Sequence, residues 1–327
     1  VTAIYDYGRS ELFKPGDEGW EQAKMLAKVT AFTLMTAREH LVWTHLLVSN
    51  TATRESAVEL PPTHPIRRLL SVFTFHATEV NIQAFDTLVP NTSILFRSVG
   101  FTYKAMQQVF EGAYTSSNAY EPFADRELNP ALQKLSDEGK FPYRSDGVVY
   151  FEIVRGFVRE WLEQAGSAAS DEHAKAFYAA VRETTLGQKY VLPPMEGMDD
   201  AMVNLLSQII FQVTAYHELI GNIIDYTILP SAAGFRLGTR DESRIDLQSF
   251  LLANIITGAT AVRMPKLMSK FANFFGKDGA PAWERVTWDD FVAKLEIQSK
   301  AVKEANETRD TEFKYFDPAE FECSVSV

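Results

Sequence analysis

The chain has 327 residues, of which 46% are hydrophobic and 12% aromatic, so it can bury a large core and is not a disordered sequence. Asp and Glu number 43 against 32 Lys and Arg, which gives a formal net charge of −11. A surface of this sign repels phosphate backbones and anionic lipid headgroups. We therefore expect no nucleic-acid partner and at most peripheral contact with a membrane.

Apolar residues recur at intervals of three and four through most of the chain, and two-residue alternation is rare. This pattern predicts an all-α fold in which any strands are short. In chain order, the predicted helices cover residues 18–48, 66–89, 99–112, 148–165, 171–184, 198–229, 246–275 and 287–306. Gly and Pro punctuate the breaks, and neither a repeat nor a long flexible linker is visible, so we expect one domain over residues 1–327.

The most apolar segment, Leu205 to Leu229, is interrupted by Gln, His, Glu, Asn and Asp side chains. Polar residues at this density predict a helix buried in protein rather than in lipid. The single cysteine, Cys323, cannot form an internal disulfide, which fits a reducing compartment such as the cytoplasm without requiring one. The sequence therefore leaves the compartment open.

Two of the six histidines, His40 and His45, lie five residues apart in a strongly apolar helical segment. In a regular α-helix this interval turns one side chain about 140° from the other, so the pair could not share a metal. A π-type turn, with i→i+5 hydrogen bonds, would bring both imidazoles to one face, and such turns occur mostly at functional sites.

His217 shows the same interval in a second apolar helix, where Asn222 follows five residues later and Gly221 would ease a local bulge. The alternative for each histidine is a core residue hydrogen-bonded to a carbonyl, which is the commoner role of a single His in an apolar helix. Spacing alone is compatible with both a metal site and a satisfied core.

Five short motifs follow one another along the chain, and together they decide between these alternatives. They are His40-x4-His45, the His64–Leu70 block HPIRRLL, the Val80–Leu88 segment VNIQAFDTL, the Phe141–Gly147 block FPYRSDG followed by a helix with Trp161, and the C-terminal Ser324–Val327 segment SVSV. In this order and at nearly this spacing they resemble the C-terminal part of the lipoxygenase catalytic domain, from about Pro15 to the last residue. The resemblance implies a single large helical domain, without the family's N-terminal β-barrel, and a metal site between two long central helices.

The resemblance also implies the metal ligands: His40, His45, His217 and the terminal carboxylate of Val327, with Asn222 as a weaker fifth ligand. The family's second motif is usually H-x3-N, whereas His217 and Asn222 are five apart, so Glu218 or a water beside Gly221 are alternatives to Asn222. Imidazoles and a carboxylate suit a first-row metal. The resemblance implies non-haem iron, with manganese as an alternative because some fungal members use it.

By resemblance, a metal-bound hydroxide rather than a side chain would take a hydrogen atom from a 1,4-pentadiene of a polyunsaturated fatty acid. Dioxygen would then add to give a hydroperoxide, an oxylipin, and the protein would hold the substrate in an apolar channel. The resemblance, carried over position by position, implies that the channel is lined by Val80, Ala84, Leu88 and Leu95. It also implies that Arg236 binds the carboxylate of the substrate. Asp225 would orient Asn222 or the metal-bound water. The alternatives are plain helix core for the four apolar residues and a surface position for Arg236 and Asp225.

Two other functions remain compatible with the sequence. The first is the same metal and radical chemistry on another apolar polyene, such as a terpenoid or polyketide. It is motivated by the absent N-terminal portion and the altered second motif. The second is a metal-free binding relic of the fold. His64, His76 and His173 lie outside the ligand pattern, and no nucleotide-binding or structural zinc motif is present.

Overall fold

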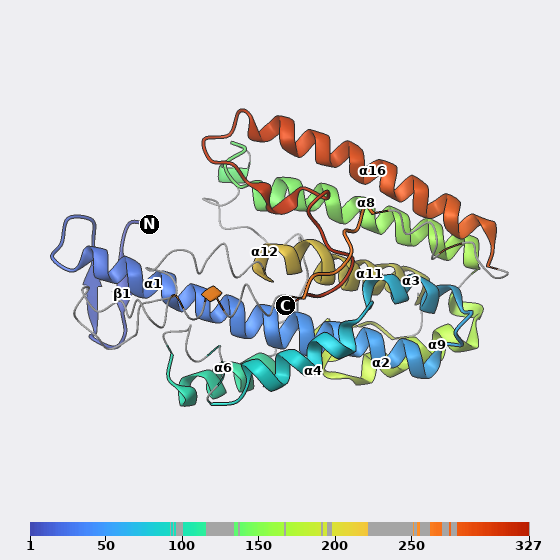
Figure 1. Ribbon diagram of the computed structural model, residues 1–327, viewed down its shortest axis with the longest axis horizontal. Helices are drawn as coiled ribbons and strands as arrows, with labels where there is room; N and C mark the ends of the chain where they lie inside the picture. The colour runs from blue at the N-terminus through green and yellow to red at the C-terminus, as the bar shows by residue number, and fades with distance from the viewer. Residues whose placement is uncertain are drawn as a thin grey trace.

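The structure, a computed structural model, describes residues 1–91, 93, 95, 101–115, 134–136, 138–166, 168–190, 192–194, 198–221, 251, 254–255, 262–269, 275 and 280–326. Within these residues the fold is almost wholly helical, as predicted (Figure 1). The strands are confined to a short antiparallel hairpin, β1 (Ile4–Asp6) and β2 (Glu11–Phe13), in which Ile4 pairs with Phe13.

One continuous helix runs from Trp20 to Glu59. It consists of α1 (Trp20–Leu34), a π-helical segment η1 (Met35–Ser49) and α2 (Asn50–Glu59), and the residues at both junctions keep right-handed helical φ and ψ. The π-type turn predicted around the two histidines is thus confirmed. The predicted end at residue 48 is wrong. The sequence of α2 is polar and lacks a clear apolar periodicity, but the helix continues through it and ends just before Pro61 and Pro62.

The predicted helix 66–89 is in fact two helices, α3 (Pro65–Phe73) and α4 (Ala77–Leu88). His76 separates them because it adopts a left-handed φ of 53°, which no helix can continue. Helix α3 begins with Pro at its first position, and the His64 ring nitrogen Nδ1 accepts a hydrogen bond from the Ile66 amide. The next described helix is α6 (Tyr103–Thr115).

The second continuous helix joins α11 (Met198–Phe211), the π-helical η3 (Gln212–Tyr216) and α12 (His217–Gly221). The rest of the predicted helix, to residue 229, lies outside the described residues. Residues 262–269 are not helical, so the predicted helix 246–275 is wrong there. Their main chain instead pairs with the C-terminal segment, through Leu267 N to Phe321 O and Cys323 N to Pro265 O.

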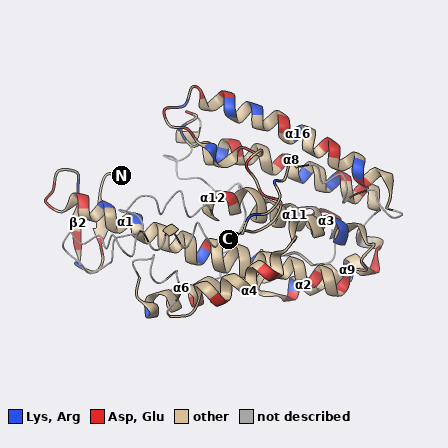
Figure 2. Ribbon diagram, in the orientation of Figure 1, with Lys and Arg blue, Asp and Glu red and all other residues tan. Residues whose placement is uncertain are grey.

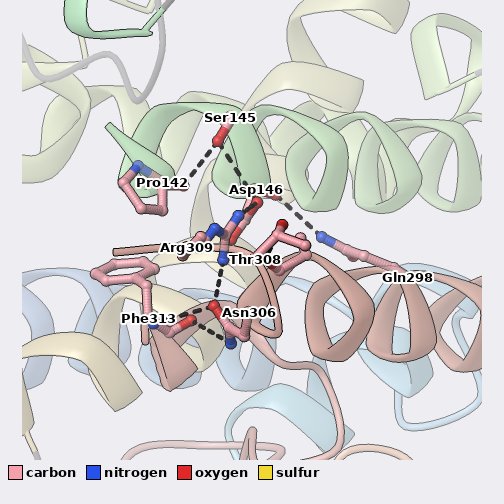
Figure 3. A network of polar contacts seen from close by, with 9 residues as sticks. Pro142, Ser145, Asp146, Gln298, Asn306, Thr308, Arg309 and Phe313 are labelled. Atoms are coloured by element: carbon pink, nitrogen blue, oxygen red, sulfur yellow. Dashed lines mark hydrogen bonds and ion pairs between the residues drawn. The ribbon is translucent and has the colours of Figure 1, made fainter. Parts of the chain in front are cut away.

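Two long helices, α8 (Pro142–Ala165) and α16 (Ala282–Asn306), begin earlier than predicted because proline is favoured at or just before a first helical turn. They run antiparallel, since Asp146 near the start of α8 meets the end of α16 (Figure 3). Its carboxylate pairs with Arg309 at 2.7 Å, and its carbonyl accepts from Gln298 at 3.0 Å. The short elements are η2 (Ala168–Ser170), α9 (Glu172–Glu183), α10 (Thr185–Lys189) and η6 (Lys314–Phe316).

The helices are stacked so that the two π-helical segments lie in the interior. Helix α8 contacts both α16 and α11, and η1 contacts η3, α12, α4 and α6 (Figure 1). The main core, rich in aromatic side chains such as Phe157, Trp161 and Trp288, fills the space between these layers. A smaller apolar cluster packs beside the first half of the long N-terminal helix.

Charged side chains gather on the outer helices. They are frequent along α16, whereas α11 carries charge only in its first turn, at Asp199 and Asp200 (Figure 2). Among the described residues, no helix has both the length and the apolar character that a membrane crossing requires.

Candidate metal centre

His40 and His45 project from η1 toward the same point. Because hydrogen bonds in a π-helix span five residues, side chains five apart come to the same face. The two Nε2 atoms are 3.1 Å apart and the ring centroids 4.7 Å.

His217, the first residue of α12, completes a triangle of ring nitrogens. Its Nε2 lies 3.0 Å from that of His40 and 3.2 Å from that of His45. All three side chains are buried, with exposed fractions of 1–3%. Within the described part of the chain, this is the single cluster of three or more His, Cys, Asp or Glu side chains close enough to share a metal ion.

The size of the triangle fits a metal ion bound by all three imidazoles. A metal–nitrogen bond of about 2.1 Å places two nitrogens about 3.0 Å apart at 90° and about 3.4 Å apart at the tetrahedral angle. The observed 3.0–3.2 Å falls in this range, so all three imidazoles can reach one metal ion. Imidazole ligands suit zinc, copper, iron and nickel, so the cluster by itself fits a first-row metal.

The three imidazoles are neutral at neutral pH. Burial, followed by the neighbouring imidazoles, holds the pKa of His40 well below its usual range, and burial does the same for His217. Burial lowers the pKa of His45 to about 4, although hydrogen bonds to Asn81 and Ser326 act in the opposite direction. Neutral imidazoles keep the lone pairs that a metal requires.

Asn81, on α4, contacts His45 from behind. Its Oδ1 lies 2.7 Å from His45 Nδ1, and its Nδ2 donates to the His45 carbonyl at 3.0 Å and to Asn50 Oδ1 at 2.6 Å. No role for Asn81 is evident from the sequence alone. One feature of the sequence could have indicated it: Asn81 is a polar residue four positions after Ala77 and three before Ala84, on the buried face of α4.

Two hydrogen bonds join the π-helical segments on either side of the triangle. Gln212 Nε2 donates to Thr44 Oγ1 at 2.7 Å, and this hydroxyl donates to the Glu39 carbonyl at 2.8 Å. The Tyr216 hydroxyl donates to the Glu39 carboxylate at 3.2 Å. Glu39, Thr44 and Tyr216 each immediately precede one of the three histidines. No sequence signal identified these links, because they join residues about 170 positions apart.

The C-terminal segment runs into the interior of the molecule (Figure 1). The Ser326 carbonyl oxygen is 3.0 Å from His217 Nε2, and the Ser326 amide donates to the same nitrogen at 3.3 Å. Val327, Asn222, Asp225 and Arg236 lie outside the described residues, so their assigned roles stay predictions.

The two alternatives to Asn222 occupy different places. Glu218 lines a cavity of about 450 Å³ together with Lys303 and Glu320, and burial raises its pKa to about 7. Gly221 instead faces the triangle, where a β-carbon would come within 2.8 Å of His40 Nε2 and 3.2 Å of His217 Nε2. Any side chain at position 221 would therefore enter the site.

The four predicted channel residues fall into two groups. Ala84 and Leu95 are buried in the smaller apolar cluster with Leu41, and Leu88 packs at its edge, whereas Val80 belongs to the main core. The first three thus pack in one cluster, and Val80, one turn before Ala84 on the same buried face of α4, packs in the main core.

The remaining histidines have structural or surface roles. The His64 Nε2 contacts Asp171 at 3.1 Å while its Nδ1 caps α3. His76 and His173 are exposed.

The comparisons with known proteins point to one fold. No family model matches the chain. The human polyunsaturated fatty acid lipoxygenase ALOX12 is 23% identical over 343 residues, covering 97% of this chain and 50% of that protein. The rat lipoxygenase ALOX15B is 23% identical over 220 residues, covering 64% of this chain and 32% of the relative. The chain thus spans half or less of the length of these relatives.

Solved structures agree over nearly the whole chain. Coral 8R-lipoxygenase matches with a TM-score of 0.74 and 18% identity, covering 99% of this chain and 53% of the other. A LOX structure in complex with arachidonate matches with a TM-score of 0.73 and 16% identity, covering 99% and 52%. The chain has the fold of the lipoxygenase catalytic domain, and the resemblance seen in its motifs is confirmed.

Proposed function

We propose that residues 1–327 form one lipoxygenase-like catalytic domain that uses non-haem iron to add dioxygen to a polyunsaturated fatty acid. The observation that carries this proposal is the buried triangle of imidazole nitrogens, with sides of 3.0–3.2 Å. The relatives named above are fatty acid lipoxygenases, and one matching structure holds arachidonate, which supports the substrate class.

His40, His45 and His217 would hold the metal, together with the carboxylate of Val327. Ser326 supports the last ligand, because its main chain is already within 3.3 Å of His217 Nε2 and one peptide unit spans about 3.8 Å between α-carbons. The chemistry that iron supplies when bound is one-electron oxidation of the pentadiene, after which dioxygen adds to the substrate. We propose Asn222 as a further ligand and Asp225 as its partner.

The side chains of the domain would position the substrate rather than exchange protons with it. Ala84, Leu88 and Leu95 would form one wall of an apolar channel, and Arg236 would bind the carboxylate of the fatty acid. Val80 would act from the main core, behind that wall.

The first test measures metal content and activity in the purified protein. We expect about one iron per chain, oxygen uptake with linoleate or arachidonate, and a conjugated-diene product that absorbs in the ultraviolet. His45→Ala should empty the site, whereas the exposed His173→Ala should behave as wild type. Oxygen uptake with other polyenes alone would move the substrate to a terpenoid or polyketide, and protein without iron or manganese would indicate a metal-free relic.

A second test addresses the terminal carboxylate. A peptide tag after Val327 should abolish metal binding while the helical circular dichroism is kept, because the carboxylate then becomes an amide. The same tag before Val1 is the matched control and should leave metal binding unchanged. A C-terminally tagged protein with full metal content would contradict the assignment of Val327.

A further inference from the structure

His45 is held on both sides of its ring. Its Nε2 faces the other two imidazoles, and its Nδ1 lies 2.7 Å from Asn81 Oδ1. Both residues are buried, with exposed fractions of 1% and 3%, so water does not compete for this hydrogen bond.

The amide of Asn81 has a defined orientation. Its Nδ2 donates to the His45 carbonyl at 3.0 Å, and a flipped amide would turn Oδ1 toward that carbonyl oxygen, where two acceptors would face each other. A second contact, from Nδ2 to Asn50 Oδ1 at 2.6 Å, holds the amide from the end of the π-helical segment. The atom that faces the imidazole is therefore the acceptor, Oδ1.

An acceptor at this position requires a hydrogen on His45 Nδ1. A neutral imidazole carries one ring hydrogen, so Nε2 is left with a lone pair that points into the triangle. The contact from Nδ2 to the His45 carbonyl also ties the backbone of the same residue to α4. The tautomer and rotation of the His45 ring thus depend on Asn81, which also contacts the main chain of the same residue.

We propose that Asn81 is a positioning residue that locks His45 in its Nδ1–H tautomer before any metal arrives. The consequence for metal capture rests on the function proposed above, whereas the tautomer itself is a property of the metal-free chain. Residues that hydrogen-bond to metal-binding histidines in this way typically contribute about 10- to 100-fold in metal affinity.

The experiment uses the full chain with 15N-labelled histidine and begins without metal. Two-bond nitrogen–proton couplings distinguish the two neutral tautomers, and a His45→Gln sample assigns the resonance. Wild-type protein should show a single Nδ1–H form of His45. Asn81→Leu, which has similar size but no acceptor, should populate the Nε2–H form, and Asn81→Asp, which keeps an acceptor, should retain the Nδ1–H form.

Metal titration then follows with Fe²⁺ under anaerobic conditions. Asn81→Leu should bind at least about tenfold more weakly than wild type, and Asn81→Asp should lose less. Asn50→Ala is the matched control: it removes the partner of Nδ2 but leaves the contact to the ring, so the tautomer should not change. Circular dichroism identifies any variant that has not folded.

Two results would overturn the inference: an Nε2–H form of His45 in the wild-type protein, or an unchanged tautomer and unchanged affinity in Asn81→Leu. If wild-type protein binds no metal while Asn81→Leu changes the tautomer, the proposed function fails and the role of Asn81 in fixing the ring stands.

Discussion

Gly221 lies against the triangle of imidazoles and places no side chain in it. A β-carbon there would lie 2.8 Å from His40 Nε2, closer than real β-carbons approach a neighbour, so the imidazole would have to move. The absence of a side chain at this position thus preserves the spacing of the triangle.

We therefore expect Gly221→Ala to weaken metal binding by about tenfold or more, measured by Fe²⁺ titration. The matched control is Gly156→Ala in α8, where a β-carbon meets nothing within 4 Å. That variant should bind metal normally and gain about 0.5–1 kcal/mol in the free energy of unfolding, because glycine is costly inside a helix. Equal metal affinities for the two variants would show that Gly221 does not need to be bare.

At the scale of elements, a buried hydrogen bond between side chains links the two π-helical segments. Thr44 and Gln212 are both fully buried, and the Gln212 amide depends on the Thr44 hydroxyl as its acceptor. The Gln212 Oε1 has no hydrogen-bond partner among the described residues. This link is therefore only partly satisfied, and removing one half of it leaves a buried donor alone.

A double-mutant cycle measures this link. Thr44→Val should lower the free energy of unfolding by about 1–3 kcal/mol, because it leaves the Gln212 amide buried and unpaired. Gln212→Leu should cost less, and the double variant should cost less than the sum of the two, with a coupling of about 0.5–3 kcal/mol. Denaturant unfolding of the four proteins gives the values, and strictly additive losses would mean that the hydrogen bond contributes nothing.

The pairing of α8 with α16 depends on a second polar link, between Asp146 and Arg309 (Figure 3). Both side chains are only about one-tenth exposed, at 10% and 13%. Arg309 also donates to Asn306 at 2.7 Å, so it connects the start of α8 to the last residue of α16.

Arg309→Ala should destabilise the protein by about 3 kcal/mol, since it leaves a mostly buried carboxylate without its partner. Lys300→Ala is the control on the same helix, where the pair with Glu304 is 79% and 63% exposed and should matter by less than about 0.5 kcal/mol. Thermal or denaturant unfolding compares the two variants. A similar loss of stability in both variants would show that the buried ion pair contributes no more than the exposed one.

At the scale of the whole molecule, the C-terminal segment is part of the core rather than a tail. Phe321, Cys323 and Val325 are fully buried, and the segment pairs with the main chain of residues 265–267. Burial raises the pKa of the Cys323 thiol to about 12, from an ordinary value near 9. The thiol is therefore expected to stay protonated and unreactive while the segment is docked.

This shift predicts a loss of stability in alkali. Below pH 9 both folded and unfolded chains hold the thiol proton, so the contribution of Cys323 is complete. Above pH 9 the unfolded chain releases the proton and the folded chain does not, so the free energy of unfolding falls by about 1.4 kcal/mol per pH unit until about pH 12. Comparing wild type with Cys323→Ala by denaturant unfolding at pH 8, 9 and 10 isolates this group.

An alkylating reagent should modify Cys323 at pH 8 only after unfolding, and rapid labelling of the native protein would contradict a docked segment.

The sequence by itself determined the helical class of this protein, the π-type turn around His40 and His45 and the family that its fold resembles. These follow from local information: apolar periodicity, the five-residue interval of His40 and His45, and short motifs in a fixed order. The bulge expected after His217 is different: the second π-helical segment ends at Tyr216, and His217–Gly221 is α-helical. Local patterns failed where a single backbone angle or a distant partner decided the outcome. His76 breaks a predicted helix through its left-handed φ, and residues 262–269 pair with the C-terminal segment instead of forming a helix.

Only the tertiary structure decided how closely the three imidazoles approach and what holds them there. Distances of 3.0–3.2 Å between nitrogens from separate helices depend on the packing of those helices, which no spacing along the chain encodes. The contacts of Asn81 with His45 and of Gln212 with Thr44 arise in the same way, from side chains 36 and 168 residues apart. Residue types and intervals are written in the sequence, but the relative position of two helices results from the whole core that packs between and around them.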